Sequence, residues 1–292
     1  MPRRGGPAAE RRIGAVPIAD GRDPQARVEA YLRDGMATVE GWLDRGSARI
    51  IVALDAIQQG IGVAGAAAEI GVHHGKLLIL LHLLLRAGER SLAIDVFARQ
   101  ELNLDRSGRG NQGILRDNLV RAGGDPARLA VIEDSSLSVT AAAVLAGVGR
   151  VRLFSVDGGH SAEVVGHDLA LAEASLAPGG VVILDDAFND HWPGVMTGLA
   201  GFLLGGTAAI RPFAIGPNKV FLCDPALAER YRQGLGRALA ALVAKEAALF
   251  GSPVVIFSDL PPVPSGAPLA ARWQRARERL RRRLRSLGYR RA

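Results

Sequence analysis

Between residues 66 and 222, short apolar runs alternate with longer stretches of helical periodicity, and this alternation restricts the chain to few architectures. The stretches between the first five runs place apolar residues three and four apart, as helices do. A strand, a crossover helix and another strand, repeated, predict a parallel sheet with helices on both faces. The expected strands are 66–70, 91–94, 129–132, 151–156, 181–184, 208–214 and 219–222, and the expected helices are 75–86, 112–122, 136–146 and 162–176.

The last two apolar runs are joined only by Ile215-Gly216-Pro217-Asn218. So short a link allows an antiparallel hairpin but not a parallel crossover. We therefore predict an α/β fold, a doubly wound, seven-stranded, mostly parallel sheet with helical N- and C-terminal extensions.

The composition along the chain suggests four parts. The first is rich in proline, glycine and arginine and is expected to be disordered, and the second shows two helical patterns, 24–45 and 48–59. After the core we expect a helix over 225–250, a proline-rich link and a basic tail. The predicted boundaries are 1–22 for the disordered segment, 23–65 for the helical preface, 66–224 for the core and 225–292 for the C-terminal extension.

The net charge of +7 is concentrated at one end of the chain. Residues 272–291 carry ten arginines and one glutamate, more than the whole positive excess, so the remainder is mildly acidic. This distribution makes nucleic acid an unlikely partner for the core. Apolar residues recur at helical spacing in the tail, so it is either an amphipathic helix, solvated or in contact with a second copy in a homo-oligomer, or a site for a polyanion.

Several features indicate a cytoplasmic protein. No apolar run reaches the roughly 18 residues that span a bilayer, so no membrane span is expected. The N-terminal arginines are not followed by the apolar stretch of a signal peptide. The single cysteine, Cys223, cannot form an internal disulfide, in keeping with a reducing compartment.

A glycine-containing loop follows the first expected strand. In open α/β sheets ligands bind beyond the carboxyl ends of the strands, where strand order reverses. Here the strand leads into Glu69-Ile-Gly71-Val-His-His-Gly75 and then a helix. The loop lacks the middle glycine of a dinucleotide-binding G-x-G-x-x-G motif. The acid of Glu69 suits a ligand with a positive amine and no phosphate, although Gly71 and Gly75 can equally be turn glycines.

The next two strand ends also carry acids. Asp95 lies 24 residues after Gly71, where a carboxylate can accept hydrogen bonds from ribose hydroxyls. Asp134 follows the third strand and can accept from the exocyclic amine of adenine, while Ser135 either joins this site or caps the next helix. Three successive strand ends with such groups predict a site for an adenosyl ligand.

The fourth and fifth strands end in a denser group of polar residues. Asp157-Gly-Gly-His160 follows one strand and Asp185-Asp186 follows the other. Converging carboxylates are costly unless a cation binds them or one stays protonated. Mg²⁺ is commonly held by one or two carboxylates, water and substrate oxygens. The alternative is that Asp186 caps the next segment and Asp157 faces solvent.

Together these segments resemble a known family. The residues are Glu69-x-Gly71-x-x-x-Gly75, Asp157-Gly-x-His160, Asp168-Leu169 and Leu176-x-Pro-Gly-Gly-Val-Val-x-x-Asp185-Asp186. They are similar to class I methyltransferases of the macrocin O-methyltransferase group, which is related to proteins named cephalosporin hydroxylases. The similarity covers about residues 66–223, and a sheet ending in a hairpin fits this group better than a dinucleotide-binding fold.

The resemblance implies a function and a set of site residues. It implies a methyltransferase that uses S-adenosylmethionine and Mg²⁺ to methylate a hydroxyl of a small molecule, a sugar or a natural product. The implied metal ligands are Asp157, Asp185 and Asp186, and Glu69, Gly71 and Asp95 would line the cofactor site.

The proton acceptor and the class of function remain open from the sequence alone. His160 and Asp157 are both candidates for the base that deprotonates the acceptor hydroxyl. Two other functions stay open, an NAD-dependent oxidoreductase on a similar sheet and a non-catalytic binding module with a methyltransferase-like fold.

Overall fold

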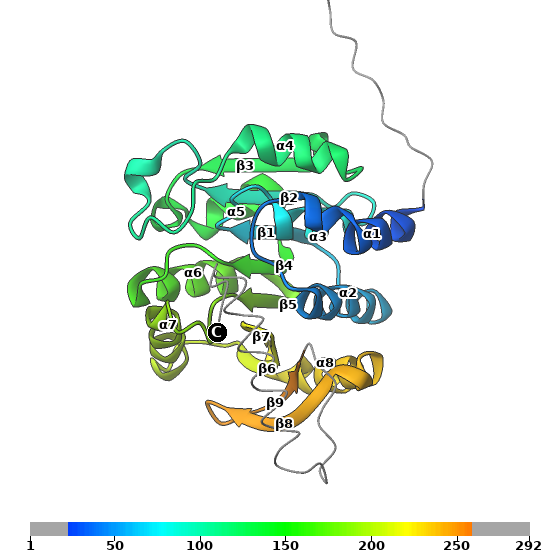
Figure 1. Cartoon of the computed structure of the whole chain (residues 1–292). Coiled ribbons are helices and arrows are strands. Elements are labelled where there is room, and N and C mark those ends of the chain that lie inside the picture. Colours follow the sequence, from blue (N-terminus) through cyan, green and yellow to red (C-terminus); the bar gives the residue numbers. More distant parts are fainter. Residues whose placement is uncertain (1–22, 259–292) are drawn as a thin grey trace, which may run out of the picture.

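A single nine-stranded sheet forms the centre of the computed structural model, which describes residues 23–258 (Figure 1). The strand order is β3-β2-β1-β4-β5-β7-β6-β9-β8. The strands are β1 Ala66–Ile70, β2 Ser91–Asp95, β3 Leu129–Glu133, β4 Val151–Val156, β5 Leu176–Leu184, β6 Arg211–Gly216, β7 Lys219–Cys223, β8 Val243–Leu249 and β9 Ser252–Phe257.

The pairing of the strands confirms the predicted doubly wound topology. Strands β1 to β5 pair in parallel, and β7 pairs antiparallel with both β5 and β6. Successive strands step outward from β1 to β3, and the chain then returns to β4 on the other side of β1. Strand order therefore reverses between β1 and β4.

Helices cover both faces of the sheet (Figure 1). One buried cluster joins the sheet to α1, α2, α3, α4 and α8, and a second joins the opposite face to α5, α6 and α7. Within residues 23–258 no helix is long and apolar enough to cross a membrane. The helices are α1 Pro24–Arg33, α2 Arg45–Gly60, α3 Lys76–Leu83, α4 Gln112–Arg121, α5 Ala141–Val148, α6 Ala162–Ser175, α7 Pro193–Leu204 and α8 Pro225–Ala238.

The C-terminal part differs from the prediction of a helix over 225–250. Helix α8 ends at Ala238, and β8 and β9 form a hairpin that extends the sheet from seven strands to nine. Phe250 and Gly251 both have positive φ, 48° and 77°, and form the tight turn between the strands. Residues 245–248 favour a helix locally, but β9 adds to the edge of β6 and buries Val254 and Phe257, which outweighs that preference.

Three smaller differences concern element boundaries. The segment 24–45, expected as one helix, contains α1, a 3₁₀ turn and an extended link, and α2 begins after Asp44, whose carboxylate accepts from the Ser47 amide at 2.7 Å. Strand β5 begins at Leu176 and not at residue 181, so the Pro-Gly-Gly segment lies within the strand. The stretch 136–146, expected as one helix, divides into a 3₁₀ turn and α5. The predicted disordered segment 1–22 and the part of the predicted C-terminal extension from 259 to 292, which includes the basic tail, lie outside the described residues.

A buried arginine anchors α2 beneath the sheet. Arg152 on β4 has no exposed side-chain surface and forms ion pairs with Asp55 at 2.8 Å and Glu89 at 3.2 Å. Its guanidinium also donates to the side chain of Gln58 at 3.0 Å. A buried charge is tolerated only when such partners surround it. This network therefore ties α2 to β4 and to the loop before β2.

We expect Arg152→Met to destabilise the fold by about 3–5 kcal/mol, because Glu89 and Asp55 lose the cation that balances their charge. Equilibrium urea unfolding measures the loss. The control is Arg150→Met at an exposed position two residues away, with an expected effect of about 0.5 kcal/mol. Equal midpoints for the two variants would contradict the role of this network.

Candidate active site

A cleft of about 640 Å³ opens at the carboxyl ends of the parallel strands. The loops after β1, β2, β3, β4 and β5 line it, and so does the segment just before α2. This is the place where strand order reverses, as expected for a ligand site in an open α/β sheet. The predicted site residues that line the cleft are Glu69, Gly71, Asp95, Asp134, Ser135, Asp157, His160, Asp185 and Asp186.

The glycine loop brings β1 against β4. Gly71 has φ of 80°, and a Cβ there would lie 1.7 Å from the carbonyl oxygen of Asp157, so only glycine fits. Gly75, also predicted as a cofactor residue, does not line the cleft. It precedes α3 with φ of 90° and leaves no room for a Cβ beside Leu115. Gly71 therefore forms part of the cleft surface, whereas Gly75 contributes to the conformation of the loop without lining the cleft.

Asp95 holds the glycine loop in place. Its Oδ2 accepts hydrogen bonds from the amides of Val72 at 2.7 Å and His73 at 2.8 Å, and its Oδ1 accepts from Phe97 at 2.7 Å. The side chain therefore couples the ends of β1 and β2. Its predicted contact with ribose would be made by the same carboxylate and stays a prediction.

Glu69 is a buried acid with an unsatisfied oxygen. The residue is 2 % exposed, and its Oε2 has no hydrogen-bond partner among the described residues. The Ser155 hydroxyl lies 3.5 Å from the other oxygen, Oε1. Burial raises the pKa of this carboxyl well above its ordinary value. Such a group beside the glycine loop suits a ligand that carries a positive charge.

Asp134 and Ser135 both reach the cleft. Asp134 accepts from the Ser135 amide at 2.8 Å and pairs with Arg99 at 3.1 Å. Ser135 precedes a 3₁₀ turn, but its side chain makes no capping hydrogen bond. Thr140 caps α5 instead, so the hydroxyl of Ser135 is not committed to a helix end.

The acids after β4 and β5 meet a lysine that the sequence analysis did not single out. Lys219, 2 % exposed at the start of β7, forms an ion pair with Asp185, whose other oxygen accepts from the Asp186 amide at 2.8 Å. One ligand atom each from Asp157, His160 and Asp186 lies within 4.8 Å of the others, and Asp185 is not in that group. The structure thus separates the three predicted metal ligands into a pair beside His160 and one engaged by Lys219.

The charges in this cluster do not balance. Burial and the neighbouring Asp185 carboxylate raise the pKa of Asp157 well above its ordinary value. Burial opposes the charge of Lys219, but Asp185 and Asp157 outweigh it and raise the lysine pKa. Glu69 adds a further buried acid nearby. A single ammonium group faces several carboxyls, and such an arrangement favours a bound cation or a retained proton.

His160 is clamped between two carboxylates. It lies just before α6, whose N-cap is Ser161. Its Nδ1 lies 2.6 Å from Asp105 Oδ2 and its Nε2 lies 3.1 Å from Asp186 Oδ2, while the ring stacks on Trp192 at 4.1 Å. Burial alone would lower the pKa of His160, but the hydrogen bonds to Asp186 and Asp105 raise it.

Asp186 is fixed by several donors. Its backbone has φ of 55°, and its side chain accepts from Asn189 at 3.0 Å and from Asn218 as well as facing His160. Burial would raise its pKa, but the hydrogen bonds from His160, Asn189 and Asn218 lower it. Asp186 therefore stays ionised more readily than Asp157, whose pKa is raised.

Sequence reasoning missed three of these residues for different reasons. Asp105 lies in a polar loop without helix or strand periodicity, so the sequence does not predict its contact with His160. Asn218 looks like an ordinary hairpin residue. A partner for Lys219 could have been predicted from one feature of the sequence. The residue begins the apolar run Val220-Phe-Leu-Cys, and a charged side chain in a buried strand must be paired.

The fold and the sequence agree on the class of protein. The doubly wound sheet with its antiparallel hairpin is that of class I methyltransferases, which confirms the predicted resemblance. Residues 68–187 match the family described as a methyltransferase domain, so this part of the chain is similar to that family. No curated protein shows significant similarity to the sequence.

Several solved structures are similar to this chain. The O-methyltransferase NovP is 14% identical, with 69% of this chain and 99% of that chain covered and a TM-score of 0.56. The calicheamicin methyltransferase CalS11 is 19% identical, covering 75% and 98%, with a TM-score of 0.45. An O-methyltransferase from Bacillus cereus in complex with SAH is 17% identical, covering 70% and 92%, with a TM-score of 0.46.

In metal-free protein we expect His160 to titrate above the ordinary 6.5, followed by NMR of the ring protons. Because its folded pKa exceeds its unfolded one, protonated His160 stabilises the fold below about pH 6.5, and this contribution disappears as pH rises through the folded pKa. Asp105→Asn should lower the pKa. Asp117→Asn, at an exposed position on α4, is the control and should leave it unchanged. A His160 pKa of 6.5 in both variants would contradict the proposed effect of the two carboxylates on this residue.

Proposed function

We propose that this enzyme transfers a methyl group from S-adenosylmethionine to a hydroxyl oxygen of a small molecule. The observation that carries the proposal is the buried, unsatisfied carboxylate of Glu69 beside a glycine loop with no phosphate motif. The cofactor's amino group would complete the hydrogen bonding of Glu69. The acids Asp95 and Asp134, on the next two strand ends, suit the ribose and the adenine amine of the same ligand. NovP, which shares this fold, is an O-methyltransferase.

The acceptor would occupy the other half of the cleft, beside His160 and Trp192. Methyl transfer needs the acceptor oxygen in line with the sulfonium and its methyl carbon, so holding the two together supplies much of the acceleration. The oxygen–carbon bond forms as the sulfur–carbon bond breaks, and S-adenosylhomocysteine leaves. The hydroxyl proton must pass to a base.

His160 is the base that the geometry favours. Asp105 binds Nδ1 and fixes the ring. Nε2 lies 3.1 Å from Asp186, and it would receive a proton from the acceptor in the neutral form of the ring, when Asp186 is engaged by the cation instead. Asp157 is a poorer candidate, because it would hold the cation in this proposal, and a carboxylate that coordinates a metal is a weak base. Asp105 is the residue that orients His160 and stabilises the imidazolium that forms.

The residues around His160 fit a divalent cation. Asp157 and Asp186 would hold Mg²⁺ with oxygens from water and the acceptor, and Asp185 would join them only after release from Lys219. A bound Mg²⁺ would lower the pKa of the acceptor hydroxyl. The surplus of buried acid over Lys219 supports this part of the proposal.

We also propose a cytoplasmic location. Cys223 is a free thiol buried in β7, and burial raises its pKa, so it behaves as an inert apolar residue. This agrees with a reducing compartment.

Glu69→Gln tests the cofactor assignment through two opposite effects. Removing an acid whose pKa is raised by burial should raise the melting temperature of the free protein, more at pH 8 than at pH 5, because the cost of ionising Glu69 grows as pH rises above its unfolded pKa. The same change should weaken S-adenosylhomocysteine binding by ~10–100-fold, the loss of a hydrogen bond to a charged group.

The measurements are thermal unfolding and isothermal titration calorimetry. Glu163→Gln, at an exposed position on α6, is the control and should change neither quantity. Unaltered S-adenosylhomocysteine affinity in Glu69→Gln would remove this residue from the cofactor site, even if the stability gain were found.

The cation site is tested with Mn²⁺ as a substitute for Mg²⁺, because binding removes the paramagnetic resonance signal of the free ion. Asp157→Asn and Asp186→Asn should each weaken binding by about tenfold or more. Lys219→Met should tighten it, since Asp185 is then free to become a ligand. Equal Mn²⁺ affinity in wild type and Asp157→Asn would contradict the assignment.

A further inference from the structure

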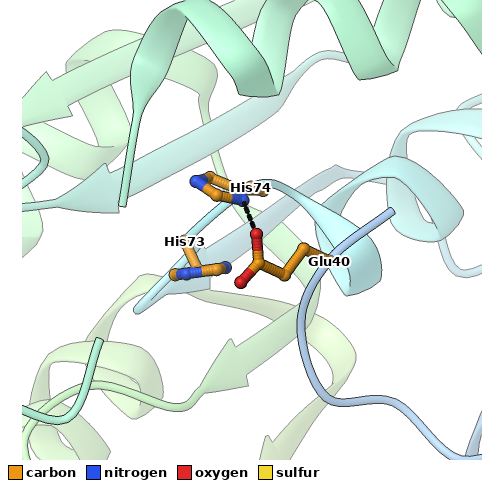
Figure 2. A group of neighbouring side chains, drawn as sticks. All are labelled: Glu40, His73 and His74. Atoms are coloured by element: carbon orange, nitrogen blue, oxygen red, sulfur yellow. Dashed lines mark ion pairs between the residues drawn. The ribbon is translucent and has the colours of Figure 1, made fainter. Parts of the chain in front are cut away.

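A second cluster of metal-ligating side chains lies at the edge of the cleft and shares no residue with the acidic site. It consists of Glu40, in the segment before α2, and His73 and His74 in the glycine loop. Figure 2 shows the two imidazole rings and the carboxylate pointing toward one another. The proposed methyl transfer assigns no role to any of the three.

The spacing of the three groups matches what one ion requires. One ligand atom from each residue lies within 4.8 Å of the others, and His74 Nδ1 is 3.3 Å from Glu40 Oε2. Zn²⁺ binds histidine nitrogen and carboxylate oxygen at about 2.0–2.2 Å, so neighbouring ligands in a tetrahedral site lie about 3.4 Å apart. Small rotations of these side chains would bring all three to that separation.

One ring nitrogen of the cluster lacks a well-formed hydrogen bond. His73 Nδ1 is buried and makes no hydrogen bond of good geometry among the described residues. Buried polar atoms almost always have a partner, and an ion is one way to provide it. This atom is the independent sign that the cluster is made for a ligand.

The backbone is shaped to bring the two rings together. His73 has φ of 52°, a left-handed conformation that residues with side chains seldom adopt. The rings of these consecutive residues consequently lie 3.9 Å apart. Asp95 accepts from the His73 amide at 2.8 Å, and Asn118 donates to the His74 carbonyl at 3.0 Å. Both hydrogen bonds hold the loop in this form.

We propose that Glu40, His73 and His74 form a site for a transition-metal ion of the Zn²⁺ type. Two imidazole nitrogens and one carboxylate favour such an ion over Mg²⁺, which prefers an all-oxygen set. Glu40 is largely exposed at 77 % and His74 is 11 % exposed, so the ion would enter from the Glu40 side. A fourth position would be open to water or to a donor from a ligand in the cleft.

The ion would stiffen one wall of the cofactor cleft. Glu40, Trp42 and His73 all line the cleft, and the Trp42 ring lies 5.5 Å from that of His73. Two contacts already join the segment before α2 to this part of the chain. One is the hydrogen bond from Lys76 Nζ, at the start of α3, to the Gly41 carbonyl at 2.9 Å, and the other is the contact between Glu40 and His74 at 3.3 Å. Coordination would tie Glu40 to both histidines of the glycine loop.

The test is a Co²⁺ titration of the untagged, chelator-stripped full chain, followed by the intense visible absorption of four-coordinate Co²⁺. We expect one equivalent to give the four-coordinate spectrum, Zn²⁺ to remove that spectrum, and excess Mg²⁺, which would occupy the acidic cluster, to leave it unchanged. His74→Ala and Glu40→Gln should each weaken binding by at least ~10–100-fold, because loss of a ligand costs no less than loss of a residue that only orients one. Far-UV circular dichroism verifies that both variants fold.

Two controls separate this site from others. Asp157→Asn should keep the Co²⁺ signal, because it alters only the acidic cluster. His191→Asn removes an exposed histidine outside the Glu40 cluster and should also keep it. Absence of the four-coordinate spectrum in wild type, or unchanged affinity in His74→Ala, would overturn the proposal. Loss of the signal in Asp157→Asn with retention in His74→Ala would place the ion in the acidic cluster and overturn it too.

Discussion

The close contact between β1 and β4 is the constraint on which the site depends. At this point the chain reverses the order in which it adds strands, and crossover helices leave to opposite faces of the sheet. The loops after the two strands then diverge above a cleft, with Gly71 pressed against the main chain of Asp157. Every proposed cofactor or cation ligand, apart from Glu40, comes from the loops and strand ends at this edge of the sheet.

Electrostatic imbalance is the second organising feature. Buried carboxyls at the ends of β1, β4 and β5 surround one ammonium group, Lys219, and burial keeps the pKa of Glu69 and Asp157 high. A core that only had to be stable would not retain this arrangement, because unpaired buried charge is costly. Positively charged ligands would relieve this imbalance, and their binding would link the stability of the ligand-free protein to its proposed chemistry.

The two halves of the cleft handle charge differently. On the proposed acceptor side, His160 lies between Asp105 and Asp186 and stacks on Trp192, so its position and its protonation are set by the same contacts. On the cofactor side, Asp95 uses its carboxylate to hold the glycine loop and so also holds His73 beside His74. One aspartate therefore supports both the proposed cofactor site and the proposed transition-metal site.

The sequence by itself determined the class of fold and most of the cleft, because alternating strand and helix periodicity admits few topologies and the acids at the ends of parallel strands must then gather at one edge. It did not determine the nine-stranded sheet, since residues 245–248 favour a helix and only burial against β6 makes them part of a hairpin. Nor did it pair Asp105 with His160 or Lys219 with Asp185, which lie 55 and 34 residues apart. Such partners are chosen by three-dimensional packing, which local sequence patterns do not record.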